Sequence, residues 1–131
     1  MWPRVDGLRT LELGSPGEQR DRLTGYVLHG AKRATAGPAQ EYEQEGEPLE
    51  QVGEVLVLLG NGSDPVGRIR ITKVVVRPFS EVPWEFAESE GEGFTSIDDW
   101  RDGHRRAWLM DGRTVHDDTR VVCLSFDLLN P

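Results

Sequence analysis

Two segments near the middle of the chain constrain the fold most, because both have the pattern of β-strands. Residues 55–59 are an unbroken apolar run, and residues 66–76 alternate before they become continuously β-branched. Asn61-Gly62 between them is a hairpin signal, since both residues tolerate the positive φ of a tight turn. Pro78 ends the second segment because proline lacks a backbone N–H. We therefore expect an antiparallel pair whose second strand is long and bent.

Three further segments carry helix signals. Ser15 can cap the first of them, and Pro16 suits the first helical position. The third segment spaces its aromatic residues so that they share one face, towards the core. The boundaries that we expect are Ser15 to Gly30, Pro83 to Gly91, and Thr95 or Ser96 to Gly112.

The remaining segments complete an α+β pattern. Residues 8–13 form a short strand or an irregular lead-in, and residues 119–129 alternate as a final strand. Gly37-Pro38 indicates a loop, and the acidic residues 42–48 lack periodicity, so we expect an ordered loop there. With four to six mostly antiparallel strands and about three helices, the chain suits a small α+β domain or a partly open barrel.

Length and charge limit the classes of function. The 131 residues suit a single domain, residues 1–131. The net charge of −8 opposes non-specific binding of long nucleic acid. A local basic patch is an alternative, but a solvated helix face is the favoured interpretation of the late arginines. These are Arg101, Arg105, Arg106 and Arg113.

The cysteine and histidine content and the lack of long apolar runs limit the compartment and the cofactors that we expect. Cys123 is the single cysteine, which excludes an intramolecular disulfide and fits a reducing cytoplasm. The start of the sequence lacks the pattern of a signal peptide, and no apolar run approaches the length of a membrane span. The histidines are scattered singly. We therefore expect a cytoplasmic protein with no membrane association, metal or redox cofactor.

Lys32 and Thr35 are the first candidates for chemistry. They lie three residues apart, directly after the glycine that ends the first helix. A buried lysine of lowered pKa can take a hydroxyl proton, whereas a charged lysine can stabilise an oxyanion or hold a phosphate. Taken alone, the spacing is common, and it favours a surface lysine beside a turn threonine.

Glu90 is the second candidate. It belongs to the run Glu88-Ser89-Glu90-Gly91-Glu92, which gathers carboxylates at a helix C-terminus, the unfavourable end of the helix dipole. A cation such as Lys32 would relieve that cost. The alternative is an exposed acidic turn.

Aromatic residues and an imidazole supply candidates for substrate binding. Trp100 and His104 share one helical face, with Arg101 beside them. They either contribute stacking and acid–base groups to a cleft or form a core aromatic with a satisfied histidine. Tyr42 can stack on a nucleobase or simply pack.

Six motifs in order resemble those of bacterial ASCH domain proteins, over about residues 11–126. Phe94 departs from the family pattern, since many relatives carry aspartate after the Glu-Gly-Glu-Gly run. The motifs are Glu12-Leu13-Gly14-Ser15-Pro16-Gly17, Gly30-Ala31-Lys32-Arg33-Ala34-Thr35, Glu45-Gly46-Glu47-Pro48-Leu49, Pro78-Phe79-Ser80-Glu81-Val82, Phe86-Ala87-x-x-Glu90-Gly91-Glu92-Gly93 and Trp100-Arg101-x-x-His104.

The resemblance implies a PUA-like fold, a small β-barrel of about five to six mostly antiparallel strands with about three flanking helices. It also implies RNA or a nucleoside as partner. One branch of the family hydrolyses the amide of acetylated cytidine, and another is linked to RNA cleavage. The functional lysine and threonine of the first branch match Lys32 and Thr35, and its glutamate matches Glu90. The expectation is a hydrolase of a modified nucleoside or small RNA element. The alternative is a non-catalytic RNA-binding or nucleotide-sensing module.

Overall fold

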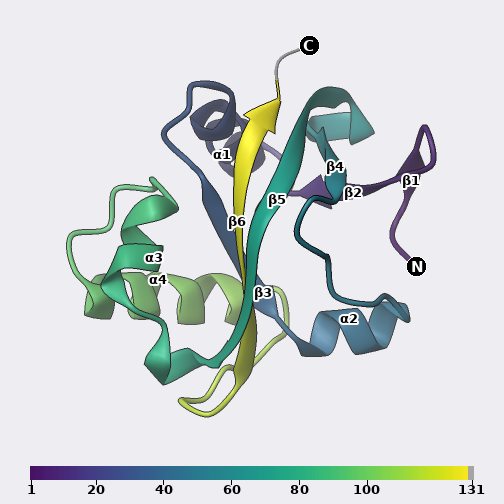
Figure 1. The fold of residues 1–131 in the computed structure, drawn as a ribbon. Coiled ribbons are helices and arrows are strands. Elements are labelled where there is room, and N and C mark those ends of the chain that lie inside the picture. The colour runs from purple at the N-terminus through teal and green to yellow at the C-terminus, as the bar shows by residue number, and fades with distance from the viewer. Residues whose placement is uncertain (130–131) are drawn as a thin grey trace.

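A six-stranded sheet forms the centre of residues 1–129, the part of the chain that the computed structural model describes (Figure 1). The strands are arranged in the order β1-β2-β4-β5-β6-β3. Their bounds are β1 Arg4–Val5, β2 Leu8–Glu12, β3 Ala34–Pro38, β4 Val55–Leu59, β5 Pro65–Pro78 and β6 Arg120–Leu129.

The sheet is mostly antiparallel and open. β2 and β4 are its one parallel pair within residues 1–129. β1 and β3 form the two edges, so the barrel is not closed. This is the expected α+β, PUA-like architecture, with β6 paired on both sides.

Helices cover both faces of this sheet. α3 and α4 lie together beside the lower half of β5 and β6, whereas α1 and α2 lie apart from them (Figure 1). The helix bounds are α1 Glu18–Leu28, α2 Gln40–Glu45, α3 Trp84–Ser89 and α4 Ile97–Met110, with 3-10 turns η1 Asn61–Ser63 and η2 Phe79–Glu81.

Two hydrophobic cores follow from strand alternation, which points successive side chains to opposite faces. Leu124 of β6 belongs to the first core, with residues of α1, α2, β4 and β5. Cys123 belongs to the second, with Phe79 and with residues of α3 and α4 such as Trp100. Trp100 and Phe79 are fully buried there and stack at 5.5 Å.

The long bent strand and the hairpin are confirmed. β4 pairs with β5 in antiparallel register, through the turn η1. Gly62 has the positive φ of 67° in that turn, as its place in the hairpin signal requires. The register between β5 and β6 shifts at Ile71–Lys73, which is the irregularity of a β-bulge and bends the strand.

The start of the first helix was wrongly expected at Ser15. α1 begins at Glu18, after Gly17, whose φ is 109°. The side chain of Gln19 accepts a hydrogen bond from the Ser15 backbone N–H. In a serine cap the serine side chain would instead accept from a backbone N–H of the helix. The end is confirmed, because the helix stops at Leu28 and Gly30 follows with a φ of 84°.

Two segments expected as loops are regular structure. Gly37 and Pro38 end β3, opposite Val122 and Val121. A proline fits there because β3 is an edge strand and one side needs no N–H. The acidic residues 42–48 fall partly within α2, which buries Tyr42, ends at Glu45 and is followed by the capping residue Gly46. A helix of six residues is too short to show periodicity in the sequence.

Candidate functional site

The end of α1 positions Lys32. The backbone N–H groups of Ala31 and Lys32 both donate to the carbonyl of Tyr26, which wraps the chain over the helix end. Arg33 then donates its backbone N–H to Ser89 O at the end of α3. These contacts bring the segment before β3 against the run that contains Glu90.

Lys32 is buried and surrounded by oxygen atoms. Only 2% of it is exposed. Its Nζ donates to Ala34 O at 2.8 Å, to Glu92 Oε2 at 2.6 Å and to Glu90 Oε2 at 3.4 Å. A buried ammonium needs this pairing, because an isolated charge in the interior is costly. The expected contact between Lys32 and Glu90 is therefore present.

Glu90 is held as an anion by three groups. Trp100 Nε1 donates to its Oε1 at 3.0 Å, and His104 Nε2 lies 3.4 Å from its Oε2, the oxygen that also faces Lys32. Burial opposes ionisation of this carboxyl. The charge of Lys32, followed by the hydrogen bond and charge of His104, outweighs burial and lowers its pKa to about 2.

Glu92 completes the group, although sequence reasoning did not select it. Gly91 has a φ of 65°, and a Cβ there would overlap the carbonyl of Ala31. This tight turn returns the chain so that Glu92 contacts the same ammonium as Glu90. Burial raises the pKa of Glu92, Lys32 opposes the rise, and the charge of Glu90 adds to it. The signal in the sequence was the glycine between two glutamates.

His104 is fixed from both sides of its ring. Its Nδ1 lies 3.0 Å from Trp100 O, and the ring stacks on that indole at 4.2 Å. Phe94 lies on another side at 5.5 Å. Burial lowers the pKa of His104, but the hydrogen bond and charge of Glu90 outweigh it, so the net shift is upward.

We call Lys32, Glu90, Glu92, Trp100 and His104 the Lys32 cluster. Glu90, Glu92 and His104 offer ligand atoms within 4.8 Å of one another, a spacing that suits a cation. The ammonium of Lys32 already bonds to both carboxylates. The cluster therefore supplies its own cation, together with two carboxyl groups whose pKa values are pushed in opposite directions.

Thr35 is not brought to this cluster. Its partner across β3 and β6 is Leu124 of the first core, whereas Ala36 packs in the second core with Trp100. Alternation therefore directs Thr35 to the face opposite Trp100. Within residues 1–129, its side chain makes no hydrogen bond to Lys32 or Glu90. The catalytic role that the family resemblance implies for Thr35 stays a prediction.

Tyr42 and Arg101 also lie in other surroundings. Tyr42 is buried in the first core, where its hydroxyl donates to Glu50 Oε1 at 2.7 Å. Arg101 donates to Ser80 O and Val82 O, and it lies 3.5 Å from Asp98. Their contacts are those of packing and loop anchoring, and their roles in substrate binding stay predictions.

The late arginines do not form a free basic patch. Arg105 pairs with Asp117 at 2.8 Å, and Arg113 pairs with Glu41 at 3.2 Å. Arg101 lies beside Asp98, and its side chain is 19% exposed. Arg106 is exposed on α4, whereas Arg113 lies after that helix, so the expected solvated helix face describes these arginines only in part.

A cleft of about 220 Å³ lies near the Lys32 cluster, although no residue of the cluster lines it, and we call it the α3 cleft. Two features join the cleft and the cluster. Ser89 lines the cleft and precedes Glu90 in the chain. Burial and then the charge of Glu90 raise the pKa of the Cys123 thiol, which also lines the cleft, to about 12. The principal lining residues are Lys73, Val75 and Arg77 of β5, Phe86 of α3, and Cys123 and Ser125 of β6.

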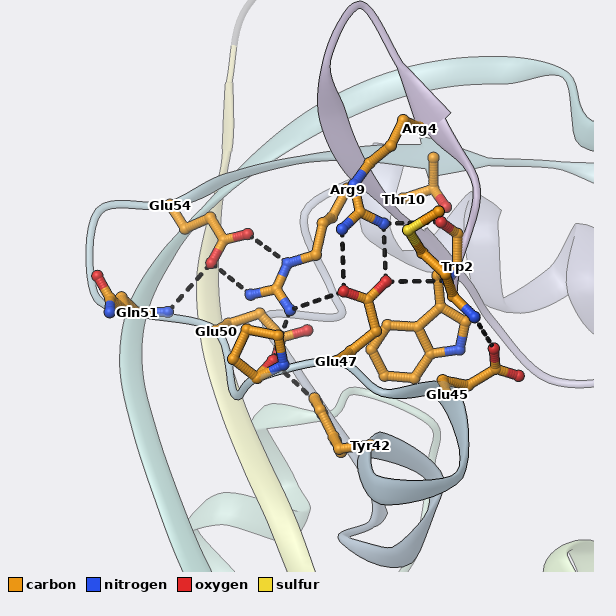
Figure 2. Close-up of polar contacts among 12 residues, drawn as sticks. Trp2, Arg4, Arg9, Thr10, Tyr42, Glu45, Glu47, Glu50, Gln51 and Glu54 are labelled. Carbon is orange, nitrogen blue, oxygen red and sulfur yellow. Dashed lines mark hydrogen bonds and ion pairs between the residues drawn. The ribbon is translucent and has the colours of Figure 1, made fainter.

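A second charged group lies near the N-terminus, and we call Arg4, Arg9, Glu47 and Glu54 the Arg9 cluster. Figure 2 shows its two guanidinium groups, each facing carboxylates. Arg4 donates to both oxygens of Glu47, and Arg9 donates to both oxygens of Glu54 at 2.7 Å. Arg9 also donates to the carbonyl of Pro48.

A cavity of about 360 Å³ adjoins the Arg9 cluster. The hydrogen bond from Arg4, although partly opposed by desolvation, lowers the pKa of Glu47 to about 2. The hydrogen bond from Arg9 likewise lowers the pKa of Glu54, against desolvation. Since each cation is already paired with a carboxylate, this cavity offers less to a ligand than its size suggests.

Sequence comparison identifies the family. The ASCH domain family matches residues 10–130. The chain belongs to this family. The ASCH domain is associated with RNA binding, and it has the PUA-like fold described above. A comparison with curated proteins gives no match.

Solved structures agree with this assignment. The ASCH domain described here is similar to protein EF3133 of Enterococcus faecalis V583, of the family DUF984, with 30% identity and a TM-score of 0.80 over 90% of this chain and 74% of that one. It is also similar to an ASCH domain from Lactobacillus crispatus, with 28% identity and a TM-score of 0.78 over 91% and 77%. A hypothetical protein, PH0355, shares the fold, with 15% identity and a TM-score of 0.60 over 85% and 94%.

Within residues 1–129, no helix combines the length and the apolar character that a membrane span needs.

Proposed function

We propose that this ASCH domain hydrolyses the amide of a modified nucleoside of the N4-acetylcytidine type, bound in the α3 cleft. The observation that carries the proposal is the pair of carboxyl groups on Lys32. Glu90 and Glu92 contact the same ammonium, yet their pKa values shift in opposite directions. Two neighbouring carboxyl groups whose pKa values are pushed apart are a common basis for acid–base chemistry.

The roles follow from these shifts. Glu90 stays ionised and holds Lys32 and His104 in place. Glu92 has the raised pKa and a side chain that is 16% exposed, so it is the better proton carrier. The three N–H groups of Lys32 are donated to Ala34 O, Glu90 and Glu92, so Lys32 acts on the oxyanion of a tetrahedral intermediate through its positive charge.

The reaction balances with water as the only co-reactant. Water adds to the acetyl carbonyl and gives a proton to Glu92. The carbon–nitrogen bond of the intermediate then breaks, and Glu92 returns the proton to the departing N4. The products are cytidine and acetic acid, which releases its proton to the solvent and becomes acetate. Thr35 takes no part in this sequence because its side chain faces the other core.

The test is acetate release from N4-acetylcytidine by the purified protein. Replacing Glu92→Gln and Lys32→Ala should each lower turnover by about 10²-fold or more, the usual contribution of an acid–base or oxyanion group. Glu88→Gln is the matched control, because Glu88 is exposed in the same run and should keep full turnover. Absence of turnover by the unmodified protein, or full turnover by Lys32→Ala, contradicts the proposal.

A non-catalytic RNA-binding module is the second candidate. Phe86 lines the α3 cleft beside basic residues, and an aromatic ring with cations is how many proteins hold an unstacked base. This candidate is supported if short RNAs bind in a salt-dependent manner and no acetate is formed. Binding of free nucleosides without binding of RNA excludes it.

A further inference from the structure

Two cations line the α3 cleft from one strand. Lys73, Val75 and Arg77 are alternate residues of β5, so their side chains share the face that carries Cys123 and Ser125 of β6. Lys73 lies directly opposite Ser125, and Val75 opposite Cys123. The bulge just before Lys73 sets this alternation, because one extra residue in the strand reverses which side chains face the helix.

Neither cation is neutralised by the protein. Within residues 1–129, neither Lys73 nor Arg77 takes part in an ion pair or a side-chain hydrogen bond. Arg22, Arg70, Arg106 and Arg120 are also without an ion pair or side-chain hydrogen bond within residues 1–129, but none of them lines the cleft. Since the chain carries 23 acidic residues against 15 basic ones, two free cations in one concavity are a specific feature.

The other polar groups of the cleft leave a positive balance. Glu85 is the single carboxylate among the lining residues, and it is exposed. The Ser89 hydroxyl already donates to Phe86 O at 2.6 Å, whereas the Ser125 hydroxyl makes no such bond within the described residues. Two cations, one carboxylate and one available hydroxyl favour an anionic ligand group.

The size of the cleft indicates which anion it suits. Its volume of about 220 Å³ is below the range of roughly 300–1,000 Å³ that is usual for complete small-molecule sites. It therefore suits part of a ligand rather than a nucleic-acid helix. Arginine and lysine are the usual partners of phosphate oxygens, Arg through its planar fork and Lys as a point charge.

We infer that Lys73 and Arg77 form a phosphate-binding subsite, so that the ligand of the α3 cleft is a nucleotide or a phosphodiester rather than an uncharged nucleoside. This inference rests on the proposed function, because the nucleoside part is taken to extend from the cleft towards the Lys32 cluster. The phosphate lies on the β5 side, away from the carboxylates of Glu90 and Glu92, which would repel it.

The first experiment uses the unmodified protein. Calorimetry compares cytidine, cytidine 5′-monophosphate and the dinucleotide CpC at low and at physiological salt. The monophosphate or the dinucleotide should bind about tenfold or more tightly than cytidine, which is the effect of one or two hydrogen bonds to charged groups. The difference should shrink as salt rises. Equal binding of all three ligands overturns the inference.

The two phosphate-bearing ligands identify the source of the phosphate. Preference for the monophosphate assigns the subsite to a terminal phosphate, whereas equal or tighter binding of CpC assigns it to an RNA backbone. Either result supports the subsite.

The second experiment uses variants. Lys73→Ala with Arg77→Ala should reduce the affinity for the phosphate-bearing ligand to that for cytidine and leave the affinity for cytidine unchanged. The control is the double variant Arg106→Ala with Arg120→Ala, which removes the same amount of charge outside the cleft. It should still bind the phosphate-bearing ligand more tightly than cytidine. If the Lys73/Arg77 variant keeps the preference as well, the subsite is not there.

Acetate release separates this inference from the proposed function. If neither an acetylated nucleoside nor its phosphate is hydrolysed but the phosphate preference depends on Lys73 and Arg77, the hydrolase fails and the subsite stands. If both are hydrolysed with the same KM, the subsite fails and the hydrolase stands.

Discussion

The Lys32 cluster and the Arg9 cluster both pair cations with carboxylates, but the effects on the carboxylate pKa values differ. In the Arg9 cluster, bidentate bonds match each guanidinium to a carboxylate, and the pKa values of Glu47 and Glu54 are both lowered. In the Lys32 cluster, one ammonium serves two carboxylates, and their pKa values move apart. Matched pairs hold a fold together, whereas an excess of carboxylates around a buried cation keeps one proton available.

The largest loss of stability should appear when Lys32, the cation of the Lys32 cluster, is replaced. Lys32→Met leaves Glu90 buried without its main counter-charge, so we expect the free energy of unfolding to fall by about 3–5 kcal/mol. Denaturant titration measures the change. Lys73→Met, at the exposed lysine of β5, is the control and should change stability by less than about 0.5 kcal/mol. A loss below about 1 kcal/mol for Lys32→Met would show that the ammonium is not the centre of the cluster.

Arg9→Met tests the matched cluster. It removes the bonds to Glu54 and Pro48, and we expect a loss of about 2 kcal/mol, smaller because Glu54 is partly solvated. Turnover of N4-acetylcytidine should not change. Arg68→Met, which breaks an exposed pair with Asp6, is the control and should cost less than about 1 kcal/mol. Loss of turnover in a folded Arg9→Met protein would remove the functional contrast between the clusters.

Acid should weaken the fold partly through Glu90. Its pKa is about 2 in the folded protein and 4.5 as the ordinary value, so its contribution is complete above pH 4.5 and is lost as pH falls towards 2. Glu90→Gln should therefore flatten the dependence of unfolding free energy on pH between about 5 and 2. Urea titrations at several pH values provide the measurement. Glu88→Gln should keep the slope of the unmodified protein, and an unchanged slope in Glu90→Gln would contradict the lowered pKa.

The smallest effect on stability is expected for Glu92→Gln. The raised pKa of Glu92 means that its ionisation costs the folded state free energy as pH rises above 4.5. The amide avoids this cost but weakens the contact with Lys32, so the net change at neutral pH should be below about 1 kcal/mol. Thermal melts at pH 5 and pH 8 should differ less for the variant than for the unmodified protein. A loss as large as that of Lys32→Met would make Glu92 a structural partner only.

Much of the fold could be predicted from the sequence because its strongest signals are local. The apolar run of β4, the β-branched residues of β5 and the serine cap of α4 each act within a few residues. β3 was missed for the opposite reason. Its strand state depends on pairing with β6, far along the chain, and Gly37-Pro38 conceals it.

The site was predictable only in part for the same reason. Resemblance to the family selected Lys32 and Glu90, and the structure brings them together. It could not show that strand alternation turns Thr35 to the other core, or that the turn at Gly91 returns Glu92 to the ammonium. Those facts depend on which face of a strand is covered and on the close approach of Ala31 to Gly91.

The place of β6 between β5 and the edge strand β3 bears on how the protein is made. β3 pairs with β6 within the described sheet, and β6 is the last of those strands to leave the ribosome. During synthesis, β3 and the Lys32 segment that precedes it therefore wait without a partner while β4, β5 and the helices emerge. The emergence of β6, rather than an earlier local folding event, therefore sets the moment at which β3 can pair and fix the Lys32 segment in the sheet.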